Sequence, residues 1–235
     1  MKEFDAFSEG YHAGFDDPLK ALVGDSVRDF LRPKAHLLFE VANKRFGKPM
    51  SSGIRLLDFG CGSADFLVEL IEFGSSWDLE GCDVSSGMLS EARRRHGVKL
   101  QQAKIWNSDE NEFPKEVYNI VTAVCVFHHI EPSAWEKNVL RIFKCLVDGG
   151  IILLYEHNPL NPVTRWMVGR TEVDRNAHLL TPAMSRALLQ GAGFKNISTS
   201  NFLFFPPRLK FLRPVERILR RVPLGGQYLV VAQKN

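Results

Sequence analysis

Short apolar runs alternate with helical patterns through most of this 235-residue chain. The runs have the length of buried strands and end in turn residues, while the segments between them carry apolar residues at helical spacing. Such alternation is typical of a doubly wound α/β fold with a mostly parallel sheet. It predicts strands over 54–59, 77–84, 98–105, 118–126 and 151–155, and helices over 64–73, 86–96, 132–146 and 181–191.

The segments that flank this alternation predict two additions. Residues 1–50 carry helical periodicity, for example at Ala35, Leu38 and Ala42, so we expect an N-terminal helical cap beside a main domain over 51–235. Segments 193–205 and 225–235 look like two further strands joined by a short basic helix. Because that connection is short, the last strand is expected to be an antiparallel insertion.

Composition excludes several other classes of protein. With 45% hydrophobic and 24% charged residues the chain can bury a full core, which argues against disorder. A formal net charge of +3 is too small to indicate a nucleic-acid partner. The four cysteines, Cys61, Cys82, Cys125 and Cys145, show no metal-ligand spacing, so they are interpreted as reduced core thiols and no metal site is predicted.

The N-terminal residues do not have the pattern of a secretory signal. The first residues include acids and glycines where a secretory signal needs an apolar stretch, and no segment reaches the ~18 apolar residues of a membrane span. We therefore expect a cytoplasmic protein. The basic amphipathic segment from Arg208 to Val222 has the pattern of a membrane-surface helix, but packing on the sheet or against a second copy in a homodimer is favoured.

The strongest functional signal is "RLLDFGCGSADF", residues 55–66. A hydrophobic strand runs into a turn with Gly60 and Gly62 and then into a helix, an arrangement that lets backbone N–H groups face a ligand. Asp83 ends the next strand, where a carboxylate in doubly wound folds accepts hydrogen bonds from ribose hydroxyls. This spacing fits NAD and S-adenosyl-L-methionine (SAM) equally well.

Two acidic residues distinguish between these two cofactors. A dinucleotide fingerprint would place its third glycine at Asp65, and a carboxylate beside a pyrophosphate is electrostatically unfavourable. Asp58, directly before the turn, suits a ligand that carries an ammonium and a sulfonium. SAM is therefore favoured over NAD.

Four motifs together resemble those of class I SAM-dependent methyltransferases: "LLDFGCGSADF", "GCDVSSGMLSEARRR", "YNIVTAVCVFHHI" and "LVDGGIILLYEH". The resemblance covers roughly residues 54–194 and implies a seven-stranded, Rossmann-like sheet with a reversed last strand. Ala64 departs from the usual glycine. A bacterial subset with an "EHNPxNPxT" segment after the fifth strand is also similar to this chain, which has "EHNPLNPVT" at 156–164.

The resemblance assigns residues to the cofactor by position. Asp58, Gly60 and Gly62 are expected at the methionine part, Asp83 at the ribose, and other residues at the adenine, near the sulfonium or in an N-terminal aromatic lid. These others are Tyr11, Val84, Met88, Ile105, Trp106, Val124, Phe127 and His128. The lid would exclude water from the sulfonium.

The acceptor side is expected beyond the fifth strand, where "EHNPLNP" begins at Glu156. Methyl transfer depends mainly on orientation, and a base is needed when the nucleophile is a hydroxyl. His157 or His128 is the candidate base, although the segment is also the pattern of a capped turn. Arg165, Arg170 and Arg175 follow and are candidates for binding an anionic group.

We therefore expect O-methylation of a small-molecule or glycan-like acceptor, with S-adenosylhomocysteine as the second product. The residues alone leave N- and C-methylation open, as well as a SAM-binding partner protein without turnover. An NAD-binding oxidoreductase is disfavoured.

Overall fold

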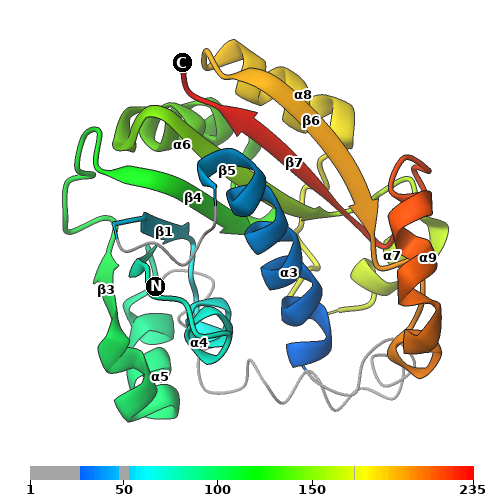
Figure 1. Ribbon diagram of the computed structural model, residues 1–235, viewed down its shortest axis with the longest axis horizontal. Helices are drawn as coiled ribbons and strands as arrows, with labels where there is room; N and C mark the ends of the chain where they lie inside the picture. The colour runs from blue at the N-terminus through cyan, green and yellow to red at the C-terminus, as the bar shows by residue number, and fades with distance from the viewer. Residues whose placement is uncertain (1–26, 48–52, 172) are drawn as a thin grey trace.

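The computed structural model describes residues 27–47, 53–171 and 173–235. Its centre is a seven-stranded sheet of order β3-β2-β1-β4-β5-β7-β6 (Figure 1). The first five strands are parallel, and β7 pairs antiparallel with both β5 and β6. The reversed, inserted last strand that the sequence predicts is thus confirmed. The strands are β1 Arg55–Phe59, β2 Asp78–Asp83, β3 Ala103–Asn107, β4 Tyr118–Val124, β5 Leu146–His157, β6 Lys195–Phe202 and β7 Gln227–Gln233.

Helices cover both faces of the sheet. Successive strand residues point to opposite faces, so Leu56 of β1 joins one core and Leu57 the other. The helices α3, α4 and α5 pack on the Leu56 face, and α6 and α8 pack on the Leu57 face. The helices are α3 Val27–Phe46, α4 Asp65–Glu72, α5 Ser86–His96, α6 Pro132–Cys145, α7 Pro162–Val168, α8 Pro182–Gly191 and α9 Arg213–Leu219, with short 3₁₀ helices η2 Gly97–Gln102, η3 Phe127–His129 and η4 Pro207–Leu212.

Two predicted elements differ from the structure. The strand expected over 98–105 is wrong in its first half, where η2 precedes β3. This half of the segment has two apolar side chains. Leu100 is buried but Val98 is 76% exposed, so only one of the two packs against the rest of the protein. The basic helix expected over 208–222 is divided into η4 and α9, and its apolar stripe does not pack fully: Val215 is 41% and Ile218 81% exposed.

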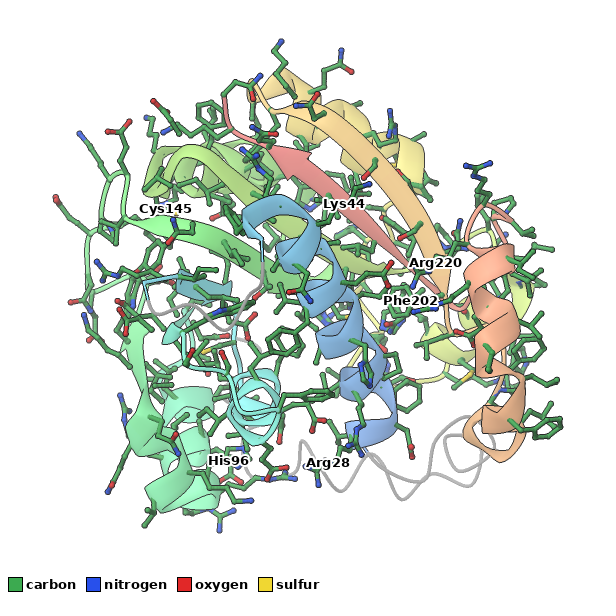
Figure 2. The ribbon with its side chains drawn as sticks, viewed as in Figure 1. Arg28, Lys44, His96, Cys145, Phe202 and Arg220 are labelled. Carbon is green, nitrogen blue, oxygen red and sulfur yellow. The ribbon has the colours of Figure 1, made fainter. Side chains whose placement is uncertain are left out.

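The N-terminal helix α3 is held by both neighbouring layers. The Tyr155 hydroxyl of β5 donates to the Lys34 carbonyl at 3.0 Å. Arg220, after α9, reaches across to α3 and forms two hydrogen bonds to the Glu40 carboxylate at 2.6 and 2.8 Å (Figure 2). This helix therefore closes one side of the sheet at the carboxyl ends of the strands. The division at residue 50 stays a prediction, and residues 1–26 lie outside the described residues.

A search of the described helices finds none that is both long and apolar enough to cross a membrane.

Candidate functional site

A cavity of about 740 Å³ lies at the carboxyl ends of the strands. The strand order reverses between β1 and β4, and crevices of open α/β sheets form at such a switch point. The walls come from the ends of β1, β2, β4 and β5, from α3 and from residues 203–206. Nine of the predicted site residues line it: Asp58, Gly60, Gly62, Asp83, Val84, Met88, Val124, His128 and His157.

The glycine turn depends on conformations that a side chain would disturb. Gly60 has φ +72°, and a Cβ there would lie 2.6 Å from Cγ1 of Val126. Its N–H and that of Cys61 donate to the Cys82 carbonyl at 2.8 and 3.0 Å, which ties the turn to β2. Gly62 has φ +50° and donates its N–H to Oδ2 of Asp83 at 2.8 Å. Hydrogen bonds to the Cys82 carbonyl and to the Asp83 side chain thus hold the turn.

Asp83 joins the glycine turn to the start of α5. Its Oδ1 accepts from the Ser85 N–H at 2.9 Å while its Oδ2 holds Gly62, and Ser85 in turn caps α5 by accepting from the Met88 N–H. An ionised carboxylate has about four acceptor positions. Asp83 therefore organises both loops and also lines the cavity.

Two buried groups of opposite character face the same cavity. Asp58 is 2% exposed, and its Oδ1 accepts from the Thr122 hydroxyl at 2.7 Å. Burial raises the pKa of Asp58 to about 7, and the charge of Asp83 adds to this rise. Lys34 of α3 is also 2% exposed, and burial lowers the pKa of its ammonium. A bound zwitterion would pair its positive group with the Asp58 carboxylate and its negative group with the Lys34 ammonium, so that neither buried charge would be left unpaired.

On the opposite wall, Glu156 organises the loop that follows β4. Its Oε1 accepts from the N–H groups of Val126 and Phe127 at 3.1 and 2.8 Å, and its Oε2 lies 2.5 Å from Nδ1 of His128. Burial alone would raise the pKa of Glu156, but the charge and hydrogen bond of His128 outweigh it, so that pKa is lowered. This buried carboxylate therefore fixes the direction in which the His128 ring points.

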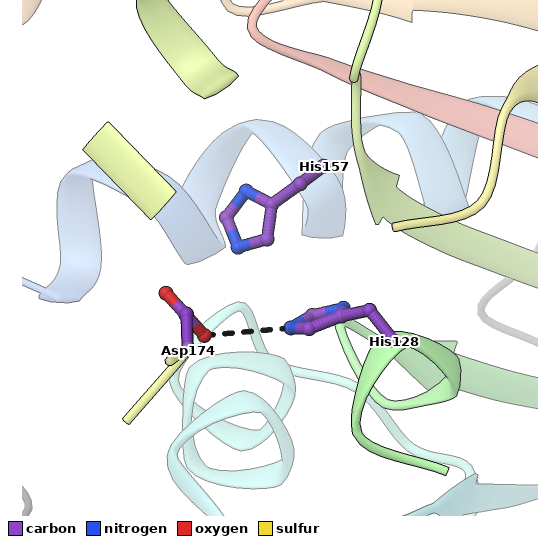
Figure 3. A group of neighbouring side chains, drawn as sticks. All are labelled: His128, His157 and Asp174. Carbon is purple, nitrogen blue, oxygen red and sulfur yellow. Dashed lines mark ion pairs between the residues drawn. The ribbon is translucent and has the colours of Figure 1, made fainter. Parts of the chain in front are cut away.

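The second nitrogen of His128 faces Asp174. Nε2 of His128 and Nε2 of His129 lie 3.6 and 3.5 Å from Oδ1 of Asp174. Burial would lower the pKa of His128, yet Glu156 and Asp174 raise it to about 9. His157 enters from the end of β5, and Figure 3 shows its ring, the His128 ring and the Asp174 carboxylate turned toward one another.

The other two histidines are weak bases. Burial, together with the positive charge of His128, lowers the pKa of His157 to about 4 and that of His129 to about 3. Both rings are therefore neutral near pH 7. His157 keeps one weak contact, Nδ1 to Nε2 of Gln227 at 3.5 Å, and its ring centroid lies 5.0 Å from that of His128.

The turn after β5 is capped by its two asparagines. Asn158 is fully buried and donates its side-chain amide to the carbonyls of Pro223 and Gly225 at 3.1 and 2.8 Å. Asn161 caps α7 by accepting from the N–H groups of Val163 and Thr164. Residues 158–161 therefore have the capped-turn structure that the sequence allowed, and the same turn presents His157 to the cavity.

Several residues from the sequence analysis do not line the cavity. Ile105 and Trp106 pack into the two cores, and the Trp106 ring lies 5.2 Å from the Phe113 ring. Phe127 is fully buried in the core under α6, so it contributes only its N–H, to Glu156. The three arginines are exposed and lie outside the lining: Arg165, Arg170 and Arg175. Tyr11 lies outside the described residues.

Three polar cavity residues on which the description of the site depends were not named from the sequence: Lys34, Asp174 and Gln227. Lys34 belongs to a helix whose pattern signals only packing, and Asp174 stands in a turn-rich segment to which the sequence assigned no role. Gln227 begins β7, and its buried Oε1 has no hydrogen-bond partner among the described residues. The one available signal was position, because Lys34 falls on the apolar face of α3 beside Ala35 and Leu38.

The reversed β7 and the glycine turn at the switch point define a Rossmann-like fold of the methyltransferase type. Residues 42–199, more than half of the chain, match the family described as a methyltransferase domain. The chain belongs to this methyltransferase domain family. The family supports the cofactor expected from the sequence, SAM, and the resemblance to the narrower "EHNPxNPxT" subset stays a prediction.

Relatives and solved structures are similar at lower identity. A carboxy-S-adenosyl-L-methionine synthase of Campylobacter fetus is 27% identical over 155 residues, 66% of this chain and 62% of that protein, so the chain spans less than two thirds of this relative. A SAM-dependent methyltransferase from Archaeoglobus fulgidus matches with TM-score 0.59 and 16% identity over 88% of this chain and 97% of that one. Phosphoethanolamine N-methyltransferase 2 of Haemonchus contortus, in complex with SAM, matches with TM-score 0.63 and 19% identity over 98% and 57%.

Proposed function

We propose that this protein transfers the methyl group of SAM to a hydroxyl oxygen of a small-molecule or glycan-like acceptor. The observation that carries the proposal is the single cavity, which runs from the glycine turn and Asp83 to the polar cluster around His128 and His157. The residues proposed to bind the cofactor and those proposed to bind the acceptor would thus share one cavity, as a direct transfer requires.

The cofactor end suits the charges of SAM. Asp58 would face the ammonium of its methionine part, and the Lys34 ammonium would face the carboxylate. Among the described residues Lys34 makes one hydrogen bond, to the Phe30 carbonyl at 3.2 Å, so two of its three donors are available. Asp83 would accept from the two ribose hydroxyls, and Met88, whose Cε lies 3.4 Å from a Cβ placed on Gly62, would close the turn side.

The acceptor end is assigned to the side of His128 and His157. Bound SAM would supply an electrophilic methyl group on a positively charged sulfur. The protein would hold the hydroxyl oxygen in line with that group, and the cluster of His128, His157 and Asp174 would lie where the hydroxyl proton is lost. Orientation of the two reactants can account for most of the rate enhancement.

Calorimetry with two ligands tests the cofactor assignment. Wild-type protein should bind S-adenosylhomocysteine and not NAD. Lys34→Met should weaken that binding about 10- to 100-fold, because a charge-assisted hydrogen bond is worth roughly 1.5–3 kcal/mol. The same substitution should leave the affinity for 5′-methylthioadenosine unchanged, since that ligand lacks the amino-acid part.

Asp83→Asn provides the matched control, because it should weaken both ligands. If wild-type protein binds neither, the proposed function is refuted. If S-adenosylhomocysteine binds but labelled methyl groups never leave SAM in the presence of varied hydroxyl acceptors, the proposed methyl transfer is refuted. The protein is then a SAM-binding protein without turnover.

A further inference from the structure

The acceptor end of the cavity brings together the donor set of a metal site. His128, His157 and Asp174 each offer one ligand atom, and these atoms all lie within 4.8 Å of one another (Figure 3). The three residues come from three separate segments: η3, the end of β5 and the turns around residues 173–176. We propose that they bind a divalent transition-metal ion, which takes the acceptor as a further ligand.

The orientation of His128 is that of a metal ligand with a supporting carboxylate. Its Nδ1 is held by Oε2 of Glu156 at 2.5 Å, which leaves Nε2 pointing at Asp174. Metal-bound histidines commonly donate their other ring N–H to a carboxylate, which fixes the tautomer and the ring direction. Glu156 is itself anchored by two backbone N–H groups, so this support is built into the fold.

The donor types restrict the ion. Two imidazoles and one carboxylate suit Zn²⁺, Mn²⁺, Fe²⁺, Co²⁺ or Ni²⁺, whereas Mg²⁺ and Ca²⁺ prefer sites made of oxygen alone. With ligand distances of ~2.0–2.2 Å, the donor atoms of a tetrahedral site lie about 3.4 Å apart. The separation of 3.6 Å between His128 and Asp174 is already close to that value, and the other separations, which are at most 4.8 Å, must close by up to about 1.4 Å on binding.

The charges near the cluster accommodate a cation. Glu156 is fully buried and Asp174 largely so, and both face His128. His129 adds a third imidazole 3.5 Å from Asp174. Lys34 and Gln227 also line the cavity. An ion bound at Nε2 of His128 would therefore lie beside the Asp174 carboxylate, with Glu156 on the other side of the His128 ring.

Three protein ligands leave coordination positions open toward the cavity, since all three line it. The role of the metal ion in catalysis, described next, rests on the proposed function. The acceptor hydroxyl would coordinate the ion through oxygen and lose its proton to solvent water. That oxygen would then form a bond to the methyl carbon while the carbon–sulfur bond breaks, and the bonding electron pair would stay on sulfur. The products are a methyl ether and S-adenosylhomocysteine.

Metal binding can be measured without any turnover. Chelator-treated protein should bind one equivalent of Co²⁺ or Zn²⁺ by calorimetry, and Mg²⁺ at least 100-fold more weakly. His157→Ala and Asp174→Ala should each weaken Co²⁺ binding at least tenfold. His178→Ala should not, because that side chain is 45% exposed and outside the cluster.

A variant that gains a signal guards against misfolding. Asp174→Cys should bind Co²⁺ and add a near-ultraviolet thiolate-to-cobalt absorption band that the wild type lacks. The proposal is overturned if wild-type protein binds no transition metal, if binding is unchanged in both alanine variants, or if Co²⁺ binds to Asp174→Cys without the new band. Binding of S-adenosylhomocysteine to metal-free protein is measured in parallel. If S-adenosylhomocysteine binds but no metal does, only the metal site is refuted. If a metal binds but S-adenosylhomocysteine does not, the proposed function is refuted.

Discussion

Asp58→Asn should stabilise the protein at alkaline pH while removing a group proposed to bind the cofactor. The Asp58 carboxyl is 2% exposed, and burial raises its pKa from 3.8 to about 7. The folded state therefore binds this proton more tightly than the unfolded state, so stability is lost as the pH rises from about 4 to about 7. At ~1.4 kcal/mol per pKa unit, the ionised carboxylate costs the folded protein about 4 kcal/mol at high pH.

An amide keeps the shape of the carboxyl and can still accept from Thr122, but it does not ionise. The free energy of unfolding of both proteins is measured by urea titration at about pH 5 and about pH 8. Part of the cost of ionising Asp58 is already present at about pH 5. The free energy of unfolding of Asp58→Asn, relative to that of the wild type, should therefore increase by about 2–3 kcal/mol between about pH 5 and about pH 8. Any constant effect of the substitution cancels in this difference.

Glu112→Gln is the control, because Glu112 is an exposed carboxyl and its substitution should show no such growth. The reasoning is refuted if the difference between Asp58→Asn and wild type is the same at both pH values. Loss of S-adenosylhomocysteine binding in the same variant would show that the destabilising charge is retained for ligand binding.

Three further substitutions test the turns around the cavity by urea unfolding. Gly60→Ala should lower the free energy of unfolding by more than ~1 kcal/mol, because Gly60 has a left-handed φ and a Cβ there would contact Val126. Adding Val126→Ala should restore only the part of this loss that comes from the steric contact. Full restoration would contradict the backbone argument. Ala64→Gly should gain about 1 kcal/mol, since Ala64 has φ 59°, and a loss would contradict this. Asn158→Ala should cost about 2–4 kcal/mol because it leaves buried carbonyls unpaired, whereas the exposed Asn111→Ala should cost under ~0.5 kcal/mol.

The fold was predictable because its signals are local. Strands that alternate with amphipathic helices have few stable arrangements, and the turn at Gly60 and Gly62 fixed which strand is β1. The strand expected at Val98 failed for a related reason. Alternating apolar residues are compatible with a strand, but Val98 found no partner surface in the folded protein.

The residues at the end of the cavity proposed for the cofactor were predictable to the same extent. Asp58, both glycines and Asp83 belong to one strand, turn, helix and strand unit, whose parallel strands bring the four residues together. Ile105 and Trp106 were placed by strand position alone, and packing turned their side chains into the two cores instead. One residue of error along a strand reverses the face to which a side chain points.

By itself the sequence determined the order of the strands and helices, the glycine turn and the acids beside it. Only the tertiary structure decided that Lys34 and Asp58 line one cavity and that Asp174 meets His128 and His157. The physical reason is distance along the chain. Periodicity and turn chemistry act over a few residues, whereas these contacts join segments that come together only when helices and loops pack around the finished sheet.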